Sequence, residues 1–220
     1  MIRTIRKSID GNKKVFAIGI LVATLTFFDS LEIQEADAAT ATYGVTLQTN
    51  VQEVITLTCD SATVNLGNLT PGTPVTGSSV CTGTTNANGG YTLAVKRDDA
   101  TTTMDKTSGP ANDTTLDITD KTTWDPTGSG NAATWTGVGL GFTVFASQAT
   151  KNTTWWGTGT TVNDALNKYA GFSAAYTNIM VHTTYGAATT NSIGYKLDVP
   201  VTQRSGAYDG TITYQATSTP

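Results

Sequence analysis

Apolar and polar side chains alternate along several short stretches of this chain. A period of two places successive side chains on opposite faces of a β-strand, so each stretch predicts a strand with one buried face. The clearest alternation covers residues 91–96, 138–145, 193–199 and 208–216. Weaker alternation covers Tyr43 to Thr49, Val51 to Thr58 and Thr63 to Leu66. Seven or more short strands are therefore expected.

Turn-forming residues gather between these stretches. They form the clusters Thr70-Pro71-Gly72-Thr73-Pro74, Asn86-Ala87-Asn88-Gly89-Gly90, Ser108-Gly109-Pro110 and Thr127-Gly128-Ser129-Gly130-Asn131. Threonine, which favours the pleated surface of a sheet, is abundant throughout. Short strands separated by such turns predict an all-β fold, an immunoglobulin-like or Greek-key antiparallel β-sandwich.

Two longer stretches, at about 98–134 and 147–190, interrupt the strand pattern. We expect them to be loop insertions in a single domain that spans residues 40–220. One short helix is expected within the second stretch. It would run from Asn163, a favourable N-cap residue, to Ala170, and would end before Gly171.

The first 39 residues have the three parts of a secretory signal peptide. Basic residues come first, namely Arg3, Arg6, Lys7, Lys13 and Lys14. A mostly apolar run follows from Val15 to Phe28, and Ala36-Asp37-Ala38 supplies small residues for cleavage. The alternative is an uncleaved membrane anchor, but about fourteen apolar residues fall short of the ~20 that span a bilayer. We therefore expect residues 1–39 to be removed, leaving a secreted, cell-surface associated protein with no stable membrane span.

Cys59 and Cys81 are the only cysteines. An even number of cysteines in an exported protein predicts a disulfide, because the compartment is oxidising. Two free buried thiols, or half of a metal site, are the alternatives.

The charge of the chain excludes one class of partner. The chain contains 13 Lys+Arg and 17 Asp+Glu, for a net charge of -4. Binding to phosphate backbones needs a basic surface, so nucleic acid is excluded. The one His, His182, has no identifiable nucleophile or orienting acid nearby in the sequence. We expect no catalytic residues, no cofactor and no metal, with a hydrolase that uses two Asp residues as the alternative.

Four tryptophans are the candidate ligand-binding residues, namely Trp124, Trp135, Trp155 and Trp156. Exposed aromatic rings present a flat apolar face on which sugars stack. The alternative is that these rings cover the core at one end of the sandwich. The aspartates between the strands are similarly ambiguous, because clustered Asp residues either bind calcium or stabilise turns. They are Asp98, Asp99, Asp105, Asp113, Asp117 and Asp120.

The last strand carries a resemblance to a known family. Tyr208-Asp209-Gly210-Thr211, followed by the alternating residues up to Ala216, is similar to the C-terminus of WxL-type cell-surface domains. Tyr214-Gln215-Ala216 stands at the place of Trp-x-Leu. The resemblance implies an exported bacterial β-sandwich with non-covalent attachment to the cell wall. Tyr208, Gly210, Tyr214 and Ala216 are then the residues that resemble the wall-binding motif.

Two functions follow from these features. The first is a non-catalytic secreted or cell-surface protein with a structural or adhesive role at the envelope. Its partners would be cell-wall polysaccharide or peptidoglycan, or copies of itself, because a first or last strand at an open sheet edge can pair with a neighbour. The second is a carbohydrate-binding module that uses the loop tryptophans.

Overall fold

The computed structural model describes residues 39–107, 116–127, 130–148 and 151–220. The predicted signal peptide therefore lies outside the described residues, except for Ala39. The chain divides into two units, residues 1–49 and 50–220. In the described part of the first unit, residues 39–49 have no regular secondary structure and exposed side chains. No helix within the described ranges is long and apolar enough to cross a membrane.

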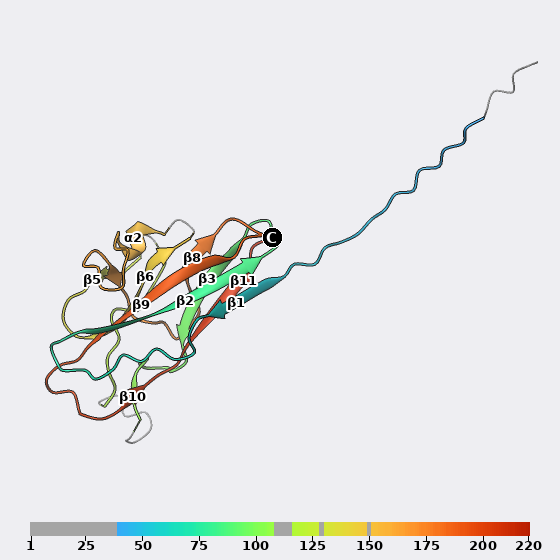
Figure 1. The fold of residues 1–220 in the computed structure, drawn as a ribbon. Coiled ribbons are helices and arrows are strands. Elements are labelled where there is room, and N and C mark those ends of the chain that lie inside the picture. Colours follow the sequence, from blue (N-terminus) through green and yellow to red (C-terminus); the bar gives the residue numbers. More distant parts are fainter. Residues whose placement is uncertain (1–38, 108–115, 128–129, 149–150) are drawn as a thin grey trace, which may run out of the picture. The chain divides into compact units, whose positions relative to one another are not determined.

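The described residues of the second unit form two larger antiparallel sheets and two short two-stranded ones (Figure 1). The first has the order β1 (Ile55–Cys59), β2 (Val75–Thr85), β9 (Thr189–Asp198), β6 (Gly139–Ser147). The second has the order β11 (Ile212–Ser218), β3 (Tyr91–Arg97), β8 (Thr177–His182). All the pairings are antiparallel, which confirms the predicted all-β antiparallel sandwich.

The remaining elements are short. Their bounds are β4 (Asp105–Lys106), β5 (Ala133–Thr134), α2 (Thr153–Trp156), β7 (Lys168–Tyr169) and β10 (Tyr208–Asp209). β4 pairs with β10, and β5 pairs with β7. The stretch 147–190, predicted as a loop insertion, contains β8 and therefore supplies an edge strand of the second sheet.

The core lies between the two sheets. In β9, Ile193, Tyr195 and Leu197 are buried, as the alternation predicts. They stand opposite Val144, Phe142 and Leu140 of β6, whose side chains are also buried. The second sheet contributes the buried side chains of Tyr91, Leu93, Val95, Ile179 and Met180.

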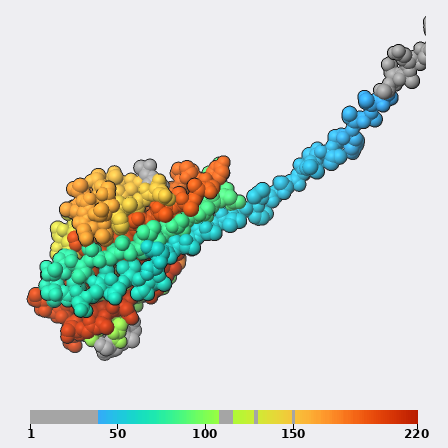
Figure 2. Space-filling view, in the orientation of Figure 1, coloured from blue at the N-terminus to red at the C-terminus, as the bar shows by residue number. Residues whose placement is uncertain are grey.

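Glycines on the other face of the first sheet let a loop approach it closely. A Cβ on Gly194 would lie 3.0 Å from Val162, and one on Gly141 would lie 3.2 Å from Tyr169. Residues 157–170 therefore pack against this face. The segment between β1 and β2, teal in Figure 2, packs instead on the core face, near Gly77, which stands opposite Tyr195 and where a Cβ would meet Val64 and Leu66.

The predicted helix from Asn163 to Ala170 is wrong. The Asp164 carboxylate accepts hydrogen bonds from the backbone amides of Thr160 and Leu166, which fixes a turn in place of a helix. Ala170 then exchanges two backbone hydrogen bonds with Phe142. Sheet pairing therefore outweighs the weak helical tendency of eight residues. The described α-helix is the single turn α2, in which Asn152 is the N-cap.

Two of the weaker predicted strands are also wrong, because their residues are described but do not form strands. Tyr43 to Thr49 and Thr63 to Leu66 have no strand assignment, whereas Val51 to Thr58 overlaps β1. Alternation alone does not make a strand, because its backbone groups need a partner strand.

Covalent and polar links join the strands at the β1 side of the sandwich. Cys59 and Cys81 stand opposite each other and form the predicted disulfide between β1 and β2. Such a link stabilises the fold by roughly 3 kcal/mol in the chain-entropy model. The hydroxyl of Tyr195 lies 2.7 Å from those of both Ser79 and Tyr214, so hydrogen bonds connect the two sheets.

Candidate functional site

Two of the four candidate tryptophans are core residues. Trp156 is 0% exposed and Trp124 is 2% exposed. Their ring centroids are 4.4 Å apart, and Trp156 also packs against Phe142 at 5.1 Å. Neither ring has an exposed face on which a sugar can stack.

The indole N–H groups of these two residues serve the fold as well. Trp124 Nε1 donates to the carbonyl of Asn178 at 2.8 Å, and Trp156 Nε1 donates to that of Ile179 at 3.0 Å. The register of β8 against β3 shifts there, at Leu93 and Ala94, as in a β-bulge. The two indoles therefore satisfy carbonyls that the irregular edge strand leaves unpaired.

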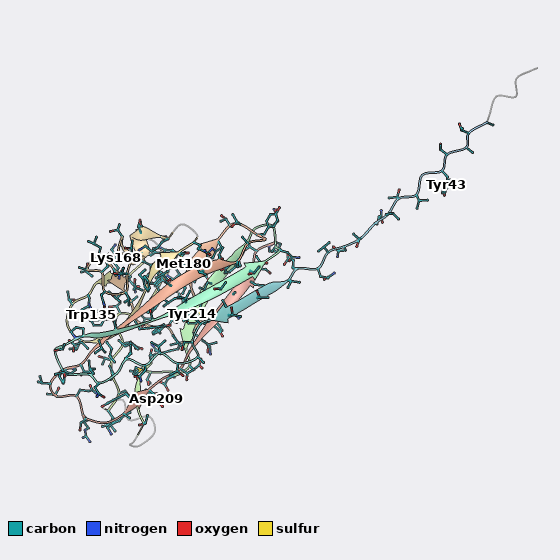
Figure 3. All side chains as sticks on the ribbon, viewed as in Figure 1. Tyr43, Trp135, Lys168, Met180, Asp209 and Tyr214 are labelled. Carbon is teal, nitrogen blue, oxygen red and sulfur yellow. A yellow bond between two sulfur atoms is a disulfide. The ribbon has the colours of Figure 1, made fainter. Side chains whose placement is uncertain are left out.

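Trp155 and Trp135 are half-buried. Trp155 meets Trp124 edge-on at 5.2 Å and so belongs to the core cluster. Trp135 lies apart from that cluster, next to β5 (Figure 3), and meets the ring of Tyr169 edge-on at 5.3 Å. The structure therefore does not bring the four tryptophans into one site.

Two lysines flank the Trp135 ring. Lys121 Nζ lies 4.1 Å from the ring centroid and Lys196 Nζ lies 5.2 Å from it, within the range of cation–π attraction. Desolvation is the main cause that lowers the pKa of each lysine. We call Lys121, Trp135, Tyr169 and Lys196 the Trp135 patch.

The two ammonium groups of the Trp135 patch differ in their availability. Lys121 Nζ donates to the carbonyls of Thr136 and Val138. Lys196 Nζ also lies 5.6 Å from the Tyr169 ring, and no hydrogen bond or ion pair to another described residue is found for it. Lys196 is therefore the cation of this patch that a ligand can approach. An aromatic face beside a cation suits a sugar that carries an anionic group.

A buried ion pair fixes one end of the sandwich. Arg97 Nη1 lies 3.2 Å from Asp120 Oδ2, and their side chains are 11% and 7% exposed. The same oxygen of Asp120 accepts hydrogen bonds from the backbone and hydroxyl of Thr103. Burial raises the pKa of Asp120 to about 6, against the lowering effects of Thr103 and Arg97. This pair ties Asp120, and through it Thr103, to β3.

His182 is part of the core, at the end of β8. Its ring stacks on Tyr91 at 4.5 Å, and Nε2 lies 3.0 Å from Asn191 Oδ1. Burial lowers the pKa of His182, which favours the neutral ring. The geometry thus gives His182 a packing role.

Of the aspartates considered for calcium, Asp113 lies outside the described residues, and the others form internal hydrogen bonds. Asp99 accepts from both the backbone and the hydroxyl of Thr101, and these bonds lower its pKa. Asp98 accepts from the Thr213 hydroxyl, and Asp105 accepts from the Thr102 hydroxyl. Within the described ranges, no three side chains of His, Cys, Asp or Glu form a group that could hold a metal ion.

The residues that resemble the wall motif occupy structural positions in β10, β11 and the link between them. The Tyr208 hydroxyl donates to the carbonyl of Arg204. Gly210 lies so close to Thr103 that a Cβ would overlap its carbonyl oxygen. Tyr214, labelled in Figure 3, and Ala216 are partly buried and pack against the core.

Comparison with known proteins adds no relative. No protein-family model matches the chain, and no curated protein matches it in sequence.

Sequence reasoning missed the two lysines of the Trp135 patch. Lys196 alternates with core residues of β9, which places it on the opposite face of the sheet. That signal was present in the sequence. Lys121 reaches the ring from a distant loop, and no local pattern indicates that contact.

Substituting a buried and a half-buried tryptophan by Ala should lower the free energy of unfolding by different amounts. We expect Trp156→Ala to lower the free energy of unfolding by about 3–5 kcal/mol, because it removes packing and leaves the Ile179 carbonyl unpaired. Trp135→Ala, the matched control, should cost roughly 1 kcal/mol. Urea denaturation followed by circular dichroism measures both. Equal losses would show that the two rings do not differ in structural role.

Asp120 should make stability depend on pH. The pKa of Asp120 is higher in the folded than in the unfolded state, so its carboxyl group contributes fully to stability below about pH 4. This contribution is lost as the pH rises through about 6. The stability difference between wild type and Asp120→Asn should therefore fall by up to about 3 kcal/mol between pH 4 and 7. Denaturation at a series of pH values tests this. A difference that stays constant over this range would contradict the assignment.

Proposed function

We propose that this protein is a non-catalytic, secreted or cell-surface protein with a structural or adhesive role at the cell envelope. It acts by binding wall polymer or copies of itself. Export by a cleaved signal peptide is part of the proposal, as is the similarity of the last strand to WxL-type domains.

The observation that supports this proposal most is the use of the reactive side chains within the fold. Asp120 pairs with Arg97, His182 stacks on Tyr91, and the cysteines bond to each other. These groups hold strands and loops together. A disulfide between strands also suits a protein that works in an oxidising compartment.

A second candidate function, a carbohydrate-binding module, rests on the Trp135 patch alone. Trp135 is half-buried, and Lys196 lies beside it with its ammonium group facing two aromatic rings. Sugar stacking on the indole and ion pairing to Lys196 would together select an anionic polysaccharide. Trp124 and Trp156 do not enter this proposal, because their rings are buried.

Fractionation of the producing cells tests the envelope role. We expect the protein to remain with the envelope fraction after washing at moderate salt, because apolar and hydrogen-bonded contacts survive screening. Release of all the protein into the medium, or into the first salt wash, would contradict an envelope role.

Sedimentation with isolated cell walls separates the two candidates. Lys196→Gln and Trp135→Ala should each reduce the bound fraction if the Trp135 patch binds wall polymer. Lys168→Gln is the matched control, because it makes the same charge change at a lysine that bonds the Thr154 carbonyl. Equal binding by all three variants would exclude the patch as the polymer site and contradict the carbohydrate-binding candidate.

A further inference from the structure

Residues 43–51 have the side-chain pattern of a strand and no strand assignment in the described part of the chain. Tyr43, Val45 and Leu47 alternate with polar residues or glycine and are 92%, 72% and 91% exposed. None of residues 43–51 belongs to a strand of the described chain. Three apolar side chains at alternate positions are exposed to water, which is unfavourable. The addition of this segment to a sheet as a strand would bury them.

The edge strand β11 offers an unpaired row of backbone groups. Thr211 accepts from Asp98, and Thr219 donates to Gly90, so the odd-numbered residues face β3. Backbone groups alternate in direction along a strand. The amides and carbonyls of Ile212, Tyr214 and Ala216 therefore face away from β3, and no hydrogen bond of theirs to another described backbone group is found.

β1 presents a similar edge on the same side of the sandwich (Figure 1). Val54 accepts from Asn86, and Asp60 donates to Val80, so the even-numbered residues face β2. The backbone groups of Ile55 and Leu57 therefore face away from β2. β1 and β11 end their respective sheets and are not paired with each other.

The opposite side of the sandwich is covered by the chain itself. The indoles of Trp124 and Trp156 bind carbonyls of β8, and Ala170 exchanges hydrogen bonds with Phe142 of β6. β1 and β11 lie beside each other, and the Ser218 hydroxyl donates to Glu53, but no backbone pairing covers either edge among the described residues. They also lack the charged residues and prolines that usually prevent edge pairing, because Ile55–Cys59 and Ile212–Ser218 contain neither.

We propose that residues 43–51 of one copy add as an extra strand along β11 of a second copy. This inference rests on the proposed envelope role and names a copy of the same chain as the partner. Nine residues span about 30 Å as a strand, enough to pair along the seven residues of β11. The donor segment, like β11, contains no charged residue and no proline.

Side-chain complementarity accompanies the backbone pairing. Ile212, Tyr214 and Ala216 are partly buried and pack against the core, which leaves apolar surface at the edge. Val45 and Leu47 fall on one face of the donor strand and would cover that surface, whereas Thr46 and Gln48 would face water. Main-chain hydrogen bonds supply affinity in such strand addition, and alternate side chains supply specificity.

Sedimentation velocity of the full chain, purified after export, tests the pairing. We expect association that increases with concentration, and a weakening of more than about a hundredfold in Val45→Asp/Leu47→Asp, because two carboxylates would be buried. Thr46→Asp/Gln48→Asp is the matched control, with the same charge change on the other face, and should associate nearly as wild type does. A monomeric wild type, or equal weakening in both variants, would overturn the inference.

A peptide of residues 41–52 locates the acceptor edge. Added to the Val45→Asp/Leu47→Asp protein, it should shift the amide resonances of Tyr214 and Ala216 in an NMR titration. Shifts confined to β8 or β6, or no shifts, would refute pairing at β11. Neither experiment contains wall material, so a negative result here refutes strand addition and leaves the envelope role to be decided by fractionation.

Discussion

Every sheet ends in two strands whose outer backbone groups need hydrogen-bond partners, and this requirement organises the whole protein. The two larger sheets present four edges, at β1, β6, β8 and β11. Those at β6 and β8 are covered from within, by Ala170 and by two indole N–H groups. The edges at β1 and β11 present unpaired backbone groups. We propose that a second copy of the chain pairs with those of β11.

The same requirement explains why aromatic residues serve two purposes here. Trp124 and Trp156 fill the space between the sheets and also bind the carbonyls at the irregular part of β8. A tryptophan used in this way is unavailable to a ligand. Trp135 has no such internal role, and the lysines beside it give its surroundings a positive charge. The tryptophans that bind the edge strand thus belong to the core, whereas Trp135 belongs to a candidate binding surface.

Local patterns predicted β3, β6, β9, β11 and part of β1, but they missed β2 and β8 and the structure of the loops. The alternation in β9 and β11 has one physical cause, a buried face, and needs no knowledge of the partner strand. The residues Asn163 to Ala170 have a cap and a stop, yet a turn at Asp164 and pairing with Phe142 prevent a helix. The buried indole of Trp156 donates to a carbonyl 23 residues away, at Ile179, and no local pattern indicates this contact.

Amide hydrogen exchange along β11, measured on the Val45→Asp/Leu47→Asp protein, tests the central claim that this edge is open. The account predicts alternation, with slow exchange at Thr213, Gln215 and Thr217, whose amides face β3, and fast exchange at Tyr214 and Ala216. Slow exchange at all five amides would show that the edge is already covered within one chain and would contradict the account.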